Sequence, residues 1–327
     1  MRAAWYDDFG PAADVLETGK RPDPVPGGGE VLVRLHASAI NPSDVKKRAG
    51  AFPELLDDGY IIPNSDGAGV IESVGVGVDS SRVGQKVWVY QAQHRRRFGT
   101  AAEYVAIDSQ RAPRLGDDID FETGAGLGIP VMTAHRCVFA DGDVKDETLL
   151  ITGGAGRVGH YAIQWASQAG ATVIATASND DDAEACRDAG ASHVVNHRDD
   201  DLAAQVIAAN KGASVDRVID VDFGANVRTS AKVLRIGGKI STYASMQEPY
   251  PRIPFYEMMY KDITIRTVIV YGMPESAKDH AIADIERALS KGRLKHRTAA
   301  TMPLNDIVRG NELVESGNAR GAVILTI

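Results

Sequence analysis

A glycine-rich turn between an apolar segment and a helical pattern constrains the fold most, in the stretch LLITGGAGRVGHYAIQWASQAG (residues 149–170). Gly154, Gly156 and Gly159 fit the spacing G-x-G-x-x-G, and a second apolar strand pattern, ATVIATA, follows the helix. Glycines at these places permit a tight turn, close approach of the backbone to a pyrophosphate, and close packing of helix on sheet. The helix N-terminus offers N–H groups and partial positive charge to the phosphates. We expect a dinucleotide site here; the alternative is a glycine turn with a structural role alone.

The sequence pattern changes near residue 121. Before it, short β-runs such as GGGEVLVRLHASAI and GAGVIESVGVGV are separated by Gly/Pro turns, which indicates a small β-rich domain. After it, strands alternate with helical segments, which is typical of a parallel sheet. The last helix and strand, in PLNDIVRGNELVESGNARGAVILTI, are expected to return to the first domain. We therefore predict an α/β protein with a β-rich domain (1–121 and 273–327) and a doubly wound parallel Rossmann domain (122–272).

Composition and charge exclude several classes of protein. The 327 residues are 44% hydrophobic and 24% charged, an ordinary globular composition, with a formal net charge of −8. This charge gives no general attraction to nucleic acid or anionic membranes. No apolar run approaches the roughly 20 residues of a membrane helix, and MRAAWYDDFG lacks a signal-peptide pattern. Cys137 and Cys186 form no CxxC motif, which argues against a disulfide framework or a structural zinc lobe. We expect a cytoplasmic protein.

The second strand of the Rossmann pattern bears on the choice of dinucleotide. An NAD site usually carries an acid at the tip of this strand, where it binds the ribose 2′-hydroxyl. Here the tip reads Ala177-Ser178-Asn179, so a 2′-phosphate meets no carboxylate and two side chains are able to donate to it. The acidic run 180–182 argues against a 2′-phosphate site, unless it caps the next helix. NADPH is therefore favoured over NADH. The residues expected at the pyrophosphate are Gly153, Gly154, Gly156, Arg157, Val158 and Gly159.

Ordered motifs along nearly the whole chain resemble one superfamily. They are INPSDVKKRAG, NSDGAGVIESVG, GTAAEYVAI, GAGLGIPVMTAHR, TGGAGRVG, GASHVVNHR and ESGNARGAVILTI. In this order they resemble the medium-chain dehydrogenase/reductase superfamily, in particular its zinc-free quinone oxidoreductase and ζ-crystallin branch. The resemblance implies a GroES-like β-rich domain, an active site between the two domains, and a homodimer or homotetramer. It also implies an NADPH:quinone reductase-like enzyme that transfers hydride to a quinone or an activated α,β-unsaturated carbonyl.

The resemblance also bears on metal. Zinc alcohol dehydrogenases of this superfamily carry a cysteine where this chain has Asn41, and a His-Glu pair where it has Ser65-Asp66. A catalytic zinc takes three protein ligands, and the eight histidines are dispersed along the chain, so no metal site is expected. Metal acidifies an alcohol for oxidation. An electron-poor acceptor such as a quinone needs less activation by the protein, because the cofactor carries the redox step.

Four residues are placed at the reacting end by the resemblance. Asn41 matches a family asparagine and is expected to donate to the acceptor carbonyl or to orient the nicotinamide ribose; otherwise it is an Asn-Pro turn residue. Thr133 matches a threonine near the nicotinamide, or packs on a helix face. Asp44 also matches the pattern, or acts as a cap or ion-pair partner. Family members often have tyrosines where this chain has Lys46 and Phe52; Lys46 would then stabilise an enolate, or be a solvated lysine.

Other cofactor candidates lie at the adenosine end and at two expected strand ends. Bacterial quinone reductases contact the 2′-phosphate through a lysine and a tyrosine, whose places here hold Asp182 and His197. ζ-Crystallin has the same NHR sequence, which supports His197. The set expected around the adenosine is Ser178, Asn179, His197, Arg198 and Arg320. Tyr243 and Tyr271 would line the ligand crevice at the carboxyl ends of strands, or are ordinary core or surface residues.

Two further hypotheses remain open. The first is a zinc-free enoyl or haloacrylate-type C=C reductase, in which Lys46, Lys47 and Arg48 would form a basic pocket for an anionic substrate. The second is a ζ-crystallin-like RNA-binding or structural protein, for which the basic run QHRRRFG (93–99) is the candidate contact. A solvated loop is the plain interpretation of that run. Redox sensing by a cysteine competes with ordinary buried packing.

Overall fold

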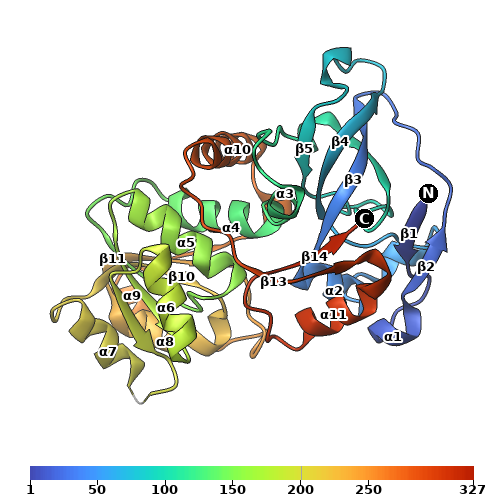
Figure 1. Ribbon diagram of the computed structural model, residues 1–327. Helices are drawn as coiled ribbons and strands as arrows, with labels where there is room; N and C mark the ends of the chain where they lie inside the picture. The colour runs from blue at the N-terminus through green and yellow to red at the C-terminus, as the bar shows by residue number, and fades with distance from the viewer. Residues whose placement is uncertain (200) are drawn as a thin grey trace. The chain divides into compact units, whose positions relative to one another are not determined.

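The structure, a computed structural model, describes residues 1–199 and 201–327 and divides into two compact units (Figure 1). Unit 1 contains Met1–Ile129 and Ile282–Ile327, and unit 2 contains Pro130–Ala281. Within the described part of the chain, no helix combines the length and the apolar character needed to cross a membrane.

Both divisions between the units fall inside helices, namely α4 (Gly128–Phe139) and α10 (Glu275–Ser290). The units therefore divide a few residues beyond the pattern changes near 121 and 273. A change of sequence pattern marks where the type of secondary structure changes. The two helices that contain the divisions begin after these points, at Gly128 and Glu275, and a local pattern does not record where along a helix one unit ends and the other begins.

Unit 1 is built on a six-stranded, mainly antiparallel sheet in the order β13-β14-β3-β4-β5, with β6 paired to β3. Its strands are β3 (Glu30–Ile40), β4 (Asp66–Val74), β5 (Lys86–Val89), β6 (Tyr104–Asp108), β13 (Thr298–Pro303) and β14 (Ala322–Thr326). In β3 the side chains of Val31, Val33 and Leu35 are buried while Arg34 is exposed, as the period-two pattern predicts. Strand β14 pairs with β3, so the C-terminal strand completes the sheet of the first unit, as the sequence predicted.

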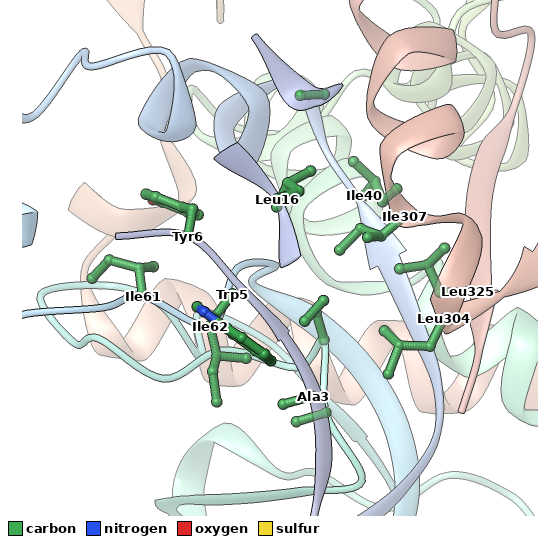
Figure 2. Close-up of a cluster of buried hydrophobic side chains, with 14 of the residues drawn as sticks. Ala3, Trp5, Tyr6, Leu16, Ile40, Ile61, Ile62, Leu304, Ile307 and Leu325 are labelled. Carbon is green, nitrogen blue, oxygen red and sulfur yellow. The ribbon is translucent and has the colours of Figure 1, made fainter. Parts of the chain in front are cut away.

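The remaining elements of unit 1 include several that contribute to one core, which joins distant parts of the chain. These remaining elements are β1 (Arg2–Trp5), β2 (Glu17–Lys20), α1 (Ala12–Val15), α2 (Pro42–Arg48), α3 (Phe121–Ala125), α11 (Ile307–Glu315) and the 3-10 turns η1 (Pro53–Leu56), η2 (Ser80–Arg82), η3 (Ser109–Arg111) and η5 (Leu304–Asp306). Figure 2 shows Trp5, Ile62, Ile40 and Leu325 in one buried cluster. Burial of such side chains contributes about 1.5–3 kcal/mol each. Ile40 belongs to this cluster and ends β3, and α2 begins two residues later at Pro42.

Unit 2 is a parallel sheet in the order β12-β11-β10-β7-β8-β9. Its strands are β7 (Thr148–Ile151), β8 (Thr172–Ala177), β9 (His193–Asn196), β10 (Val215–Asp220), β11 (Leu234–Thr242) and β12 (Thr264–Thr267). Its other helices are α5 (Arg157–Gln168), α6 (Asp180–Ala189), α7 (Leu202–Ala209), α8 (Phe223–Val233), α9 (Phe255–Tyr260) and the 3-10 turn η4 (Val270–Gly272). The strand order reverses between β7 and β10, where doubly wound sheets bind ligands. The predicted α/β fold with a Rossmann sheet is confirmed.

Candidate functional site

The glycine turn joins β7 to α5 and needs its glycines for backbone reasons. Gly153 has φ +62°, in the left-handed region that glycine adopts without cost. A Cβ on Gly154 would lie 2.8 Å from Cys186 Sγ, so this glycine lets the turn pack against α6. A Cβ on Gly159 would overlap the carbonyl oxygen of Gly153. The first turn of α5 and the loop before it therefore touch backbone to backbone, as the motif predicts.

Hydrogen bonds fix this turn at the point where the strand order reverses. The Gly153 N–H donates to Thr176 Oγ1 at 2.9 Å, from the end of β8. The Thr152 hydroxyl donates to Asp220 Oδ1 at 2.8 Å and accepts from the Val221 N–H at 2.9 Å. The ends of β7, β8 and β10 are thus tied together around the turn.

The start of α5 suits an anion. Gly156 is the N-cap of α5, and no side chain caps the helix there; the first N–H groups of a helix have no intrahelical acceptor. Arg157 and Val158 in that turn are only half-buried. N–H groups and helix dipole together attract phosphate. The predicted pyrophosphate residues therefore come together in one turn of unit 2.

At the tip of β8, Asn179 caps α6. Its Oδ1 accepts from the Asp182 N–H at 2.8 Å, and its Nδ2 donates to the Asp182 carboxylate at 3.0 Å. The N-cap is therefore Asn179 rather than the acidic run 180–182, of which Asp182, 5% exposed, accepts from the cap side chain. Asp180 and Asp181 are exposed. Ser178 is half-buried beside them, and its Oγ accepts from Asn179 Nδ2 at 3.3 Å.

His197 follows β9 at the same edge of the sheet as Ser178. Ala177 pairs with Asn196 in register, and the His197 backbone N–H donates to the Ala177 carbonyl at 3.1 Å. The imidazole Nδ1 also lies 3.0 Å from that carbonyl oxygen, which orients the ring. Arg198 is exposed next to it. The structure therefore brings together four of the five residues predicted around the adenosine.

The other predicted cofactor residues are more scattered. Thr133 is buried in α4, 5% exposed. Tyr243 follows β11 and its N–H donates to the Asp220 carbonyl; burial raises the pKa of its phenol well above the usual value. Tyr271 lies in η4, because β12 ends at Thr267, earlier than the apolar pattern suggested. Arg320 belongs to unit 1, is exposed, and donates to the Gly317 carbonyl.

In unit 1, Asn41 and Asp44 belong to a buried polar cluster at the start of α2. Asn41, Asp44, Ser65 and Asp66 are each at most 1% exposed. The Asn41 Nδ2 donates to Asp66 Oδ2 at 2.8 Å, and the Asn41 backbone N–H donates to Asp44 Oδ2 at 2.9 Å. The Ser65 hydroxyl donates to Asp44 Oδ1 at 3.0 Å. The Ile129 N–H donates to Asp66 Oδ2 at 2.8 Å. Two buried carboxylates therefore hold the Asn41 side chain and backbone.

The lysine in this cluster is Lys47, which sequence reasoning mentioned only for an anionic substrate. Lys46, the lysine predicted to act in catalysis, is exposed, whereas Lys47 is 4% exposed. The Lys47 Nζ donates to the Gln93 carbonyl at 3.0 Å and lies 4.0 Å from Asp44 Oδ1. Burial lowers the pKa of Lys47, while Asp44 and Asp66 raise it. The spacing of Asp44 and Lys47, three apart on one helix face, was the available sequence signal.

No metal donor set accompanies this cluster. Among the described residues, no group of three or more His, Cys, Asp or Glu side chains is arranged to hold an ion. At the three positions matched to zinc ligands, this chain presents an amide, a hydroxyl and one carboxylate, and zinc prefers thiolate, imidazole and carboxylate. The Asp66 carboxylate is already bonded to Asn41 and to the Ile129 N–H.

Asp220 is a site residue that sequence reasoning missed. It ends β10, is 0% exposed, and its Oδ1 accepts from Thr152 and from Asn226 Nδ2 at 2.7 Å. Burial raises the pKa of its carboxyl, an effect that these two hydrogen bonds partly offset. An acid that follows the buried run RVI at the end of VDRVID is a pattern that would have identified it.

Replacing Asp220 with asparagine is expected to change how stability depends on pH. Between pH 3.8 and the higher pKa of the folded state, the folded wild type binds more protons than the unfolded chain, so its stability falls as pH rises. Asn226 and Thr152 are able to donate to an asparagine oxygen, so the variant keeps these bonds without the charge. Urea unfolding from pH 4 to 8 should show wild type losing stability relative to Asp220→Asn, by about 1.4 kcal/mol per unit of raised pKa. A constant difference across that range would contradict the burial argument.

Comparisons with known proteins agree with both units. Residues 27–117 match the family model described as alcohol dehydrogenase GroES-like domain, and residues 158–287 match zinc-binding dehydrogenase. A quinone oxidoreductase from Homo sapiens is 28% identical, over 100% of this chain and 98% of that protein. A 2-haloacrylate reductase from Burkholderia sp is 27% identical, over 92% and 91%. A mycobacterial protein solved in complex with NADPH has a TM-score of 0.88 at 25% identity, with 100% of each chain covered.

Proposed function

Because the chain belongs to the medium-chain dehydrogenase/reductase superfamily, we propose that it is a zinc-independent, NADPH-dependent oxidoreductase that reduces a quinone or an activated α,β-unsaturated carbonyl. The observation that carries the proposal is the glycine turn at the strand-order reversal, with its Gly153–Gly159 backbone contact. The quinone oxidoreductase relative and the NADPH complex of the mycobacterial protein support the cofactor and the reaction type.

Residues of this chain have separate tasks in that reaction. NADPH, when bound, supplies the hydride. The start of α5 binds the pyrophosphate, and Ser178, Asn179 and His197 surround the adenosine phosphate. Asn41, with one amide hydrogen held by Asp66, uses its second N–H to bind the acceptor carbonyl and stabilise the charge that develops there. Thr133 orients the nicotinamide.

Zinc independence is supported by how the polar cluster is built. The zinc-binding dehydrogenase match covers residues 158–287, which excludes Asn41, Ser65 and Asp66. The Asp66 carboxylate accepts hydrogen bonds from the Asn41 amide and from the Ile129 backbone N–H. An electron-poor acceptor does not require a Lewis acid of the kind that alcohol oxidation uses.

An acceptor panel tests the proposal. NADPH consumption is followed at its absorbance maximum with a quinone, an enone and an acrylate-type acid, each with and without a chelator. We expect turnover with the quinone or enone, unchanged by the chelator. Loss of turnover on chelation, restored by zinc, would contradict zinc independence, and no turnover with any acceptor would contradict the function.

Cofactor choice gives a sharper prediction at the tip of β8. Substituting Ser178→Asp places a carboxylate beside the expected 2′-phosphate, so NADPH should bind about tenfold or more weakly while NADH is unaffected or improved. Ser178→Ala is the matched control, since it removes the hydroxyl without adding charge. Dissociation constants from fluorescence titration measure both. An unchanged NADPH/NADH ratio in Ser178→Asp would remove Ser178 from the site.

The C=C reductase hypothesis is the second candidate, and the 2-haloacrylate reductase relative favours it. Preference for the acrylate-type acid in the panel would select it. The RNA-binding hypothesis gains no support, because Arg96 and Arg97 donate to the carbonyls of Ala106 and Tyr60. Those guanidinium groups are used inside unit 1.

We also propose a homo-oligomer formed through unit 2. Strand β12 is at the edge of its sheet, where backbone groups are able to pair with another chain. Large apolar side chains are exposed on and near it and on α9: Phe255, Tyr256, Met259, Tyr260, Ile265 and Ile269. Exposed patches of this kind mark association surfaces. Sedimentation of a monomer at micromolar concentration would contradict this proposal.

A further inference from the structure

The Lys47 ammonium is surrounded by oxygen atoms inside unit 1. Its Nζ donates to the Gln93 carbonyl at 3.0 Å, to Ser65 Oγ at 3.3 Å and to Gln93 Oε1 at 3.4 Å, and lies 4.0 Å from Asp44 Oδ1. The side chain is only 4% exposed. Removing such a cation from water is costly unless opposite charge and hydrogen bonds compensate for it.

The charge that compensates Lys47 comes from Asp44 and Asp66. Both carboxylates are buried, at 1% and 0% exposed, and both interact electrostatically with Lys47. The neighbouring Arg48 is directed elsewhere, to the Gly10 carbonyl and to Glu315. Lys47 is therefore the ammonium of α2 that faces these two carboxylates.

A chain of hydrogen bonds connects this cation to Asn41. The Lys47 Nζ bonds to Ser65 Oγ, whose hydroxyl donates to Asp44 Oδ1. The other oxygen of Asp44 accepts from the Asn41 backbone N–H. The Asn41 amide then donates to Asp66. Displacement of the ammonium would release Ser65 and Asp44, and with them the backbone that carries Asn41.

We infer that Lys47 is a positioning residue: its ammonium holds Ser65 and Asp44 so that Asn41 presents its amide to the acceptor carbonyl. The inference rests on the proposed function, because Asn41 has its acceptor role there. In this role Lys47 acts through Ser65 and Asp44 rather than on the acceptor or the cofactor. It acts by fixing the geometry and the charge of the network behind Asn41, which is needed for preorganised hydrogen-bond donation.

Three variants test this inference in the full chain. Lys47→Met keeps the side-chain volume without the charge, Lys47→Ala removes three methylenes and the ammonium, and Lys291→Ala changes an exposed lysine as control. We expect Lys47→Met to lower kcat about 10- to 100-fold with the KM for NADPH unchanged. Wild-type kcat in Lys47→Met would overturn the inference.

Chemical rescue separates positioning from general structural support. Propylammonium replaces the atoms that Lys47→Ala lacks, so it should raise kcat of this variant but not of wild type or Lys291→Ala, and sodium chloride at equal ionic strength should not. Loss of kcat with no rescue, accompanied by a lower Tm in both Lys47 variants, would show a structural role and overturn the inference.

Thermal unfolding keeps this test independent of turnover. If wild type reduced no acceptor, the proposed function would fail, but ligand binding to the folded state would still raise Tm. Propylammonium is then expected to raise the Tm of Lys47→Ala alone. A Tm unaffected by propylammonium would show that the oxygen atoms around the Lys47 position do not bind an ammonium group. This result would overturn the inference whether or not the proposed function holds.

Discussion

Substituting Gly159→Ala is expected to destabilise unit 2 and to weaken NADPH binding strongly. The added Cβ would overlap the Gly153 carbonyl oxygen and lie 3.0 Å from Gly154 Cα. These are backbone atoms, so relief requires the turn itself to move rather than a side chain to rotate. Overpacking costs about 1–3 kcal/mol. Each backbone hydrogen bond lost to a phosphate would cost about tenfold in affinity.

Gly156→Ala is the comparison within the same turn. Its Cβ would meet only the Gly153 carbonyl oxygen, at 3.1 Å, and its φ of −72° is open to alanine. We expect this variant to remain near wild type in stability and to lose less NADPH affinity than Gly159→Ala. Urea unfolding and NADPH titration of both variants measure the two effects. Equal losses in the two variants would show that the helix–loop contact is not what Gly159 provides.

The sequence predicted the glycine turn and the parallel sheet well, because their requirements are local. The turn needs glycines at set positions between a strand and a helix, and the structure places Gly153 and Gly159 in contact accordingly. The return of the C-terminal strand was also predictable, since its apolar pattern had to join a sheet, and β14 pairs with β3. The cap of α6 was expected from the acidic run 180–182, whereas the structure uses Asn179, whose Oδ1 accepts from the Asp182 N–H.

The side-chain environment of α2 could not be predicted in the same way. Lys46 was chosen because it occupies the place of a family tyrosine, yet the structure exposes Lys46 and buries Lys47. The helix has seven residues, and its buried face is determined by segments distant in sequence, around Ser65 and Gln93. Tertiary contacts of this kind leave no local periodicity over so short a helix. Asp220 differs, because it had a local signal that was not used: an acid at the end of the buried strand VDRVID.

Substituting Gly128→Ala is expected to disrupt the Asp66 carboxylate and with it the support of Asn41. A Cβ on Gly128 would lie 2.5 Å from Asp66 Cγ and 2.9 Å from Oδ2. The carboxylate has little freedom to retreat, because its Oδ2 is held by the Ile129 N–H and by Asn41 Nδ2, both at 2.8 Å. Loss of such bonds to a buried charge costs about 1.5–3 kcal/mol each. We therefore expect a stability loss of about 3 kcal/mol and a kcat at least about tenfold lower.

Gly126→Ala is the matched control for Gly128→Ala, because a Cβ there would make only ordinary contacts, the nearest at 3.4 Å from the Thr123 carbonyl oxygen. It should unfold in urea as wild type does. A double-mutant cycle with Asp66→Ala assigns the cause. If Gly128→Ala acts through the Asp66 carboxylate, its cost should largely disappear once that carboxylate is gone, since alanine leaves room for the new methyl group. Full additivity of the two substitutions would mean that Gly128 serves the helix start alone, and that the support of Asn41 by Asp66 does not depend on this close approach.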